Sequence, residues 1–257
     1  MIELTIADDI AEVVLNAPKK RNAVDASALH ELADAYTRAE QAGVRALVLR
    51  GEGKAFCAGR DIAEVDPVTD DALGFMRGTL QPVLEQMAAF PAPTFAVAHG
   101  ACLGIGLGLL IATDVVYVAE SAKVGSPFAA LGATLDSGGH ALLFERLGAH
   151  RAFDLIYSGK LMSGAEAVAA GLFSRAFPDD EVLEATRAAA AHAAQGPTLA
   201  FLATKEIIRG LRDERQGLWR SVDAENVAQE QLRQTADFRE GFAAFQEKRA
   251  PRFTGRG

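Results

Sequence analysis

The chain has 257 residues, of which 49% are hydrophobic and 23% charged, as expected for one large α/β domain or one domain with a helical appendage. Its 34 acidic and 26 basic residues give a net charge of −8, which argues against general binding to nucleic acid or to an anionic membrane. The sequence shows no signal-peptide pattern and no apolar run of the roughly 20 residues that a membrane-spanning helix needs. We therefore expect a soluble, cytoplasmic protein with no membrane or nucleic-acid partner.

The first part of the chain predicts a hairpin, a helix and a strand. Residues 2–6 and 11–15 alternate apolar and polar side chains around an Asp-Asp turn, which is typical of a β-hairpin. The polar loop N-A-P-K-K-R-N-A-V-D then ends at Asp25, the predicted N-cap of a helix. Residues 46–49 predict a short buried strand. The segment G-E-G-K-A-F-C-A-G-R-D-I follows as a turn of small residues, with Asp61 as the predicted cap of a further helix.

The middle of the chain alternates predicted helices and strands. A helix over residues 71–90 is closed by two prolines. Residues 94–98 predict a strand that runs directly into a glycine-rich turn and the start of an apolar helix. Residues 115–119 predict another strand, and Asp136 or Ser137 is the predicted N-cap of the helix that follows.

Nearly every later pattern is helical. The remaining predicted helices cover residues 151–157, 165–170, 181–194, 199–209, 219–234 and 238–247. The composition changes near Gly196-Pro197, which predicts a core of residues 1–195 and a helical C-terminal module of residues 196–257. The module carries much apolar surface for its length, and such helices usually cover the core domain or another subunit.

The two cysteines, Cys57 and Cys102, lie in apolar stretches flanked by glycine. We interpret them as small buried residues rather than as a disulfide framework. Two cysteines cannot by themselves build a structural zinc site, and no histidine–cysteine spacing suggests one, so no metal is expected.

Glycines 104, 106 and 108 directly follow the predicted strand at residues 94–98. Their spacing differs from the G-x-G-x-x-G pattern of dinucleotide-binding folds, because Leu109 stands where the third glycine belongs. A nicotinamide site is therefore disfavoured, while glycines that allow close helix packing remain an alternative. A strand, a glycine turn and a helix start also present several free backbone N–H groups to one point.

The turn A-F-C-A-G-R-D offers the same feature a second time. If the N–H groups of Ala58 and Ile105 converge, they form a hole with two donors for one carbonyl oxygen, each worth about 3 kcal/mol to a developing oxyanion. Each turn taken alone is equally explained as a tight connection, so the hypothesis depends on the pair.

Five stretches of the sequence together resemble the crotonase (enoyl-CoA hydratase/isomerase) superfamily. They are N-A-P-K-K-R-N-A-V-D, G-K-A-F-C-A-G-R-D-I, the run from Gly100 to Asp114, D-S-G-G and A-F-Q-E-K-R-A-P-R-F, in the family's order over nearly the whole chain. The resemblance implies an α/β fold with a spiral core of ββα turns and a C-terminal helical trimerisation module. It also implies an acyl-CoA thioester substrate, a homotrimer or dimer of trimers, and no cofactor beyond the coenzyme A of the substrate. The thioester carbonyl is expected between the N–H groups of Ala58 and Ile105.

The sequence departs from the family's hydratases at their two glutamates, which match Gly108 and Phe128 here. Neither residue can exchange a proton, so an ordinary hydratase is disfavoured. Asp136 is the acid that remains, and it is either a helix N-cap, a role that Ser137 could fill instead, or the catalytic acid and base. An aspartate occupies this position in relatives that isomerise ring or dienoyl thioesters. Phe128 together with D-S-G-G resembles the ring 1,2-epoxyphenylacetyl-CoA isomerases in particular.

Basic and small residues in the matching motifs are candidates for binding coenzyme A and the acyl group. The candidates are Lys20, Arg21, Ala23, Ala58, Gly59, Arg60, Asp61, Ile62, Gly104, Ile105, Phe128 and Lys248. Lys19, Lys54 and Arg249 are further cations that could meet phosphate groups or a neighbouring subunit's ligand. For any single one of these cations, a solvated surface charge is the more common role.

The sequence thus favours an acyl-CoA isomerase of fatty-acid or aromatic-compound metabolism. In this hypothesis an oxyanion hole stabilises an enolate, and Asp136, with a pKa raised by burial, moves a proton between two carbons. Two alternatives stay open, namely a non-catalytic acyl-CoA binding protein and a hydratase or hydrolase on the same scaffold.

Overall fold

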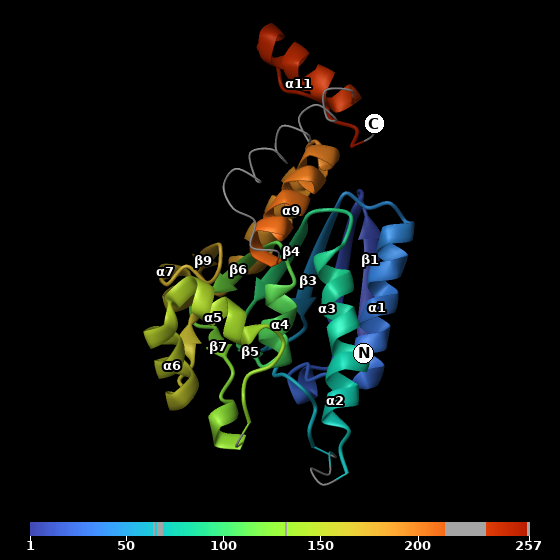
Figure 1. Ribbon diagram of the computed structural model, residues 1–257. Coiled ribbons are helices and arrows are strands. Elements are labelled where there is room, and N and C mark those ends of the chain that lie inside the picture. The colour runs from blue at the N-terminus through green and yellow to red at the C-terminus, as the bar shows by residue number, and fades with distance from the viewer. Residues whose placement is uncertain (64, 66–68, 132, 214–234, 256–257) are drawn as a thin grey trace.

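The computed structural model describes residues 1–257 except 64, 66–68, 132, 214–234 and 256–257. Its centre is a six-stranded sheet in the spatial order β1-β2-β3-β4-β6-β9 (Figure 1). The strands are β1 (Ile2–Ala7), β2 (Ile10–Leu15), β3 (Ala46–Gly51), β4 (Thr94–Ala98), β6 (Val115–Ala119) and β9 (Arg175–Phe177). β1 and β2 pair antiparallel as a hairpin, and the pairs that follow across the sheet are parallel, so helical crossovers join their strands.

Helices pack against this sheet. The helix α1 packs on α3 in front of the sheet in Figure 1, while α8 contacts β3 and β4. The helical segments are η1 (Pro18–Lys20), α1 (Ala26–Gln41), α2 (Ala72–Phe75), η2 (Met76–Leu80), α3 (Gln81–Ala88), α4 (Ile105–Ile111), η3 (Phe128–Leu131), α5 (Gly139–Leu147), α6 (Ala149–Ser158), α7 (Gly164–Ala169), α8 (Val182–Ala194), α9 (Thr198–Asp213) and α11 (Ala236–Glu247). Every residue of β4 is buried, and such a continuous apolar run is typical of a parallel strand covered on both faces.

A second, three-stranded sheet determines where the glycine-rich turn lies. It consists of β5 (Ala101–Leu103), β7 (Lys123–Gly125) and β8 (Met162–Ser163), in the order β5-β7-β8. The chain passes from β4 in the large sheet to β5 in the small one and then enters α4, which gives one ββα turn of the expected spiral core.

Most of the predicted elements are confirmed. The hairpin forms, and the carboxylate of Asp25 caps α1 by accepting the Ala28 N–H at 2.8 Å. The prediction that Asp61 caps a helix is wrong for the described residues: its carboxylate accepts hydrogen bonds from Lys20 at 2.9 Å and from the Ala63 N–H, in a turn, at 3.3 Å, and the next described helix, α2, is capped by Asp71. The helix predicted over residues 71–90 is present as α2, η2 and α3, where η2 is a wider, π-helical turn.

Other predictions were incomplete. β5, β7, β8 and β9 have at most three residues each, too few for an alternating pattern to reveal them. Cys57 and Cys102 are buried free thiols, as expected. The predicted helix over residues 219–234 lies outside the described residues.

The C-terminal helices α9 and α11 extend away from the sheets (Figure 1). Arg45 anchors the start and the end of this module, because its guanidinium donates to the Gly196 carbonyl at 2.6 Å and to the Phe253 carbonyl at 3.2 Å. From α9, the ammonium of Lys205 reaches the Asp114 carboxylate at 2.9 Å. Whether the module joins copies of the chain stays a prediction. Across the described residues, no helix is both long and apolar enough to cross a membrane.

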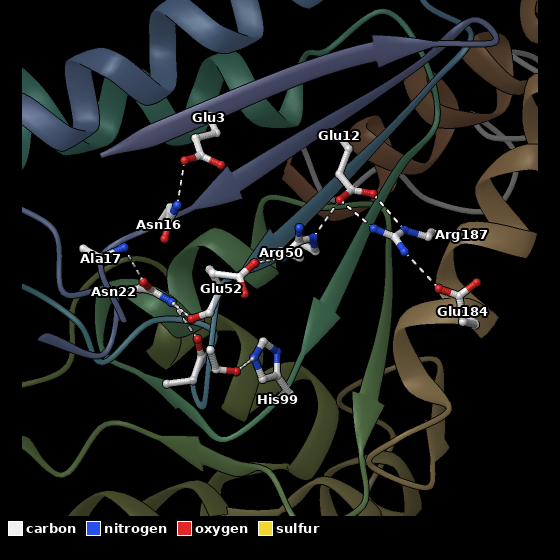
Figure 2. A network of polar contacts seen from close by, with 12 residues as sticks. Glu3, Glu12, Asn16, Ala17, Asn22, Arg50, Glu52, His99, Glu184 and Arg187 are labelled. Carbon is white, nitrogen blue, oxygen red and sulfur yellow. Dashed lines mark hydrogen bonds and ion pairs between the residues drawn. The ribbon is translucent and has the colours of Figure 1, made fainter. Parts of the chain in front are cut away.

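A network of charged side chains joins β2, β3 and α8 (Figure 2). Glu12 on β2 accepts hydrogen bonds from Arg50 on β3 at 2.7 Å and from both Nε and a terminal nitrogen of Arg187 on α8 at 2.9 Å. Burial alone would raise the pKa of Glu12, but the hydrogen bonds from Arg187 and Arg50 outweigh it and hold the pKa below its usual value. The network therefore fastens α8 to the sheet through one ionised carboxylate.

Glu12→Gln is expected to lower the free energy of unfolding by about 2 kcal/mol, because two half-buried guanidinium groups lose the charge that they share. Glu184→Gln is the control, since Glu184 is 74% exposed and its ion-pair partner among the described residues is Arg187, and it should cost less than about 0.5 kcal/mol. Urea unfolding at several pH values measures both. The pKa of Glu12 is lowered in the folded state, so its contribution is present above the unfolded pKa and is lost as the pH falls through the folded one. A difference between wild type and Glu12→Gln that is independent of pH would contradict this account.

Candidate active site

Two glycine turns approach each other at the end of β5. Gly59 has φ +104° and Gly104 has φ +53°, backbone conformations that side chains rarely adopt. A Cβ on Gly59 would lie 3.1 Å from the Leu103 carbonyl oxygen and 3.9 Å from the Gly104 Cα. The peptides that follow the two glycines, Gly59–Arg60 and Gly104–Ile105, are therefore neighbours.

The backbone around Gly59 fixes the direction of the Arg60 N–H. The Gly59 carbonyl accepts the Val24 N–H at 2.9 Å, and Asp61 N–H donates back to the Val24 carbonyl at 2.8 Å. The C=O and N–H of a planar trans peptide point in opposite directions, so the Arg60 N–H points away from Val24. Ile105 is the first residue of α4, where the N–H groups have no partner within the helix. Neither N–H donates a hydrogen bond to any residue that the structure describes.

The structure corrects the prediction that Ala58 supplies one of the two donors. The Ala58 N–H donates to the Arg21 carbonyl at 3.0 Å and is therefore already in use. The unused N–H belongs to Arg60, two residues later. A symmetry in the sequence could have revealed this, because Arg60 follows Gly59 as Ile105 follows Gly104. The arrangement can stabilise negative charge on one oxygen atom through two preorganised N–H groups.

Phe128 forms an apolar wall beside this pair. Its ring lies against the Gly104 backbone, since a Cβ on Gly104 would be 3.0 Å from Cζ and 3.1 Å from Cε1 of the ring. Phe128 is half-buried in the short turn η3. It contributes shape and low polarity to the site but no proton.

Gly108 lies one helical turn after the start of α4, where its N–H donates to the Gly104 carbonyl at 3.1 Å. A Cβ at this position would collide with the Cβ of Ser137. The space that a side chain of residue 108 would need is therefore occupied by Ser137. This places the loop with Asp136 and Ser137 one turn of α4 away from the Ile105 N–H.

Asp136 is not a helix cap. Gly138, with φ +85°, is the N-cap of α5, and no side chain caps this helix. The N-cap prediction is therefore wrong for both Asp136 and Ser137, because a left-handed glycine separates them from the first helical residue. The side chain of Asp136 instead accepts the Ser137 hydroxyl hydrogen at 2.8 Å.

The surroundings of Asp136 favour its protonated form. Burial raises the pKa of the Asp136 carboxyl above its usual value, while hydrogen bonds from Ser137 and from the backbone of Asp136 itself, and the charge of Arg60, oppose this rise without cancelling it. Carboxyl groups that act as acid and base at neutral pH commonly have pKa values raised in this way.

Two of the predicted coenzyme-binding cations already have partners within the chain. The guanidinium of Arg60 makes two hydrogen bonds with Asp70, at 2.6 and 2.8 Å, and its carbon lies 4.1 Å from the centre of the Phe75 ring. Lys20 pairs with Asp61 at 2.9 Å. These contacts make both side chains structural in this state, so the expectation that they are open phosphate ligands has no support from the geometry.

Of the remaining predicted substrate-binding residues, some lie beside the Gly59 turn and others lie elsewhere in the protein. Arg21 and Ile62 are exposed beside the Gly59 turn, whereas Ala23 is buried. Lys248 follows α11, which Figure 1 shows beyond α9 and well away from α4, so one chain does not bring Lys248 to the other candidates.

Comparisons with known proteins agree with this architecture. A family model described as enoyl-CoA hydratase/isomerase matches residues 5–256. The chain is 37% identical to a Rhodobacter capsulatus protein named "Probable enoyl-CoA hydratase", over 99% of this chain and 98% of the relative. It is 35% identical to enoyl-CoA hydratase domain-containing protein 2, mitochondrial, of Bos taurus, over 96% of this chain and 84% of that protein.

A crystal structure of an enoyl-CoA hydratase from Bacillus anthracis superposes with a TM-score of 0.89 at 30% identity and covers 99% of both chains. Sequence and fold thus agree over nearly the full length of the protein. The chain therefore belongs to the enoyl-CoA hydratase/isomerase family, with the crotonase fold.

Proposed function

We propose that the protein is an acyl-CoA isomerase in which Asp136 is the single acid and base. The observation that carries the proposal concerns the two positions that the family resemblance assigns to the hydratase glutamates: Gly108 has no side chain and Ser137 fills its space, while Phe128 is a hydrocarbon wall. Addition of water to a double bond needs groups that hold the water and exchange a proton with carbon. A site in which Asp136 is the acid, among the residues that the structure describes, is better suited to moving a proton between two carbons of the same substrate.

The chemistry follows from the two backbone donors. A thioester carbonyl bound to the N–H groups of Arg60 and Ile105 is polarised, which makes a hydrogen on the neighbouring carbon more acidic. Asp136 removes that proton, and the electron pair moves into the carbonyl to form an enolate. The enolate of an unsaturated acyl group takes the proton back from Asp136 at a carbon further along, so the double bond shifts. No atom is gained or lost overall.

The aromatic wall supports a cyclic or aromatic acyl group as the substrate. The Phe128 ring offers a flat apolar face next to the peptide that would hold the carbonyl. Such a face suits an acyl group with a planar apolar ring better than a polar acyl group. Enolate formation beside a ring epoxide would likewise help to open and rearrange it.

A panel of straight-chain, cyclic and aromatic enoyl-CoA thioesters, incubated with the enzyme in deuterated water, tests the proposal. We expect at least one thioester to give a product of the same atomic composition with a shifted double bond or rearranged ring, and to take up deuterium at the α or γ carbon. Mass spectrometry separates the alternatives, because hydration adds one water and hydrolysis releases coenzyme A. A protein that binds the thioesters with neither exchange nor isomer formation above background would be a binder, and that result would refute the proposal.

A further inference from the structure

Ser137 links the acid of the site to the helix that begins at the oxyanion donors. It has φ +54° and is followed by Gly138 at φ +85°, so two consecutive residues adopt the left-handed conformation. Serine is uncommon in this conformation, and such local strain persists only where the surroundings fix it. Here the surroundings are Gly108 on one side and Asp136 on the other.

The first contact is one of shape. The Ser137 Cβ occupies the space above Gly108, and a Cβ on residue 108 would also be only 3.1 Å from the Ser137 carbonyl oxygen. Gly108 and Ser137 are therefore complementary: the missing side chain on α4 makes room for the one in the loop. This contact sets the distance between the loop and α4.

The second contact is a hydrogen bond. The Ser137 hydroxyl donates to Oδ1 of Asp136 at 2.8 Å, and Oδ2 accepts no hydrogen bond from another residue that the structure describes. A carboxylate oxygen held in this way fixes the plane of the group and leaves the other oxygen to exchange a proton.

We propose that Ser137 is a positioning residue for Asp136, which seats the loop on Gly108 and holds one carboxylate oxygen so that the other one faces the substrate carbon. This inference rests on the proposed role of Asp136 as acid and base. It adds that the place of Ser137 depends on the absence of a side chain at residue 108.

The charges around Asp136 make the hydroxyl important. Among the described residues, Arg60 is the charged group that affects the pKa of Asp136. Its guanidinium already forms an ion pair with Asp70. The nearby His140 is hydrogen-bonded to Thr134 in the same loop, at 3.1 Å. Ser137 therefore supplies a side-chain hydrogen bond that favours the ionised, proton-accepting form of Asp136, in addition to the one from the backbone of Asp136 itself.

Ser137→Ala tests the hydrogen bond, because it keeps the Cβ above Gly108 and removes the hydroxyl. We expect kcat for proton exchange to fall about tenfold, with KM changed less than about twofold, as for loss of one hydrogen bond to a charged group. The acidic limb of the kcat–pH profile should move to higher pH, because the lost hydrogen bond is one that lowers the pKa of Asp136. A change in thermal stability with kcat and the pH limb unaltered would show a merely structural role and overturn the proposal.

The pair Ser137→Gly and Gly108→Ala/Ser137→Gly separates shape from hydrogen bonding. The double variant places a methyl group on α4 in the space that the Ser137 Cβ leaves, but it has no hydroxyl. We expect its kcat to stay as low as that of Ser137→Gly. Recovery of full kcat in the double variant would show that Ser137 only fills space.

The outcome for Asp136 keeps the two proposals apart. If Asp136→Asn abolishes exchange but Ser137→Ala leaves kcat and the pH limb unchanged, the isomerase proposal stands and the positioning role fails. If Asp136→Asn retains full activity, the proposed function itself fails.

Discussion

Asp136→Asn is expected to lower kcat for proton exchange and for isomerisation by about 10³-fold, the usual scale for removing a general acid and base. Asparagine has the same shape and still accepts the Ser137 hydrogen bond, so the pocket stays intact. Affinity for the acyl-CoA should therefore change by less than about threefold, because binding and proton transfer are separate in this site. Deuterium exchange at the substrate carbon and titration calorimetry measure the two quantities on one preparation. An Asn variant with full turnover would end the assignment.

Asp136→Asn, which lowers activity, is expected to raise the stability of the folded protein near pH 7. The pKa of Asp136 is raised by burial, so the folded protein binds this proton more tightly than the unfolded chain does. The stabilisation is present below the unfolded pKa and is lost as the pH rises through the folded one, which leaves a costly buried charge at neutral pH. Asp136→Asn should therefore unfold at a higher temperature than wild type near pH 7, and the difference should vanish in acid.

Stability also separates this account from the helix-cap interpretation. Loss of an N-cap through alanine costs about 1 kcal/mol. Gly138 provides the N-cap of α5, so Asp136→Ala should not show that loss. Asp25→Ala is the matched control, because Asp25 does cap α1 through the Ala28 N–H, and it should show the full cost.

The parts of the fold that the sequence predicted well are those governed by local chemistry. The strand Thr94–Ala98 is predicted to the residue, because a continuous apolar run closed by glycine has few other solutions. Asp25 caps its helix because the short acidic side chain acts on its own neighbours. The short strands of the small sheet were not predicted from the sequence, since their hydrogen bonds depend on partners far along the chain.

The errors in the site have one physical origin. Whether the N–H of Ala58 or of Arg60 is free depends on which way the peptides around Gly59 face, and the φ of +104° that decides this is not legible in the sequence. The same holds for Asp136, since the left-handed Gly138 decides that α5 starts without a side-chain cap. Glycine marks where the backbone turns, but the direction of the turn is set by the tertiary contacts.

Gly59→Ala should be the second most damaging single change, with kcat/KM lowered by about 10²-fold, the cost of losing one oxyanion donor. The new Cβ would lie 3.1 Å from the Leu103 carbonyl oxygen, which belongs to the backbone and cannot swing aside. The φ of +104° also strains any side chain. Relief requires the Gly59–Arg60 peptide to rotate or withdraw, and either movement takes the Arg60 N–H away from the carbonyl that it would bind.

Backbone strain also lowers stability, so the effect on activity needs a matched control. Gly43 has φ +67° just after α1, and apart from its chain neighbours no described atom lies within 4 Å of the place that an alanine methyl group would take, so Gly43→Ala adds strain without touching the site. Both variants should lose about 1 to 3 kcal/mol of unfolding free energy. Only Gly59→Ala should lose turnover when rates are normalised to the folded fraction from circular dichroism.

Gly104→Ala gives an independent probe of the second donor. Its Cβ would press on the Phe128 ring at 3.0 Å, and a ring at the end of a side chain can yield where a backbone carbonyl cannot. We therefore expect a smaller loss of kcat/KM than for Gly59→Ala, and partial recovery when Phe128 is also replaced by alanine. Equal losses at residues 43, 59 and 104 would show that strain alone is responsible. Full activity in Gly59→Ala would show that the Arg60 N–H does not bind the carbonyl, because a change in the backbone at residue 59 also changes the direction of the Arg60 N–H.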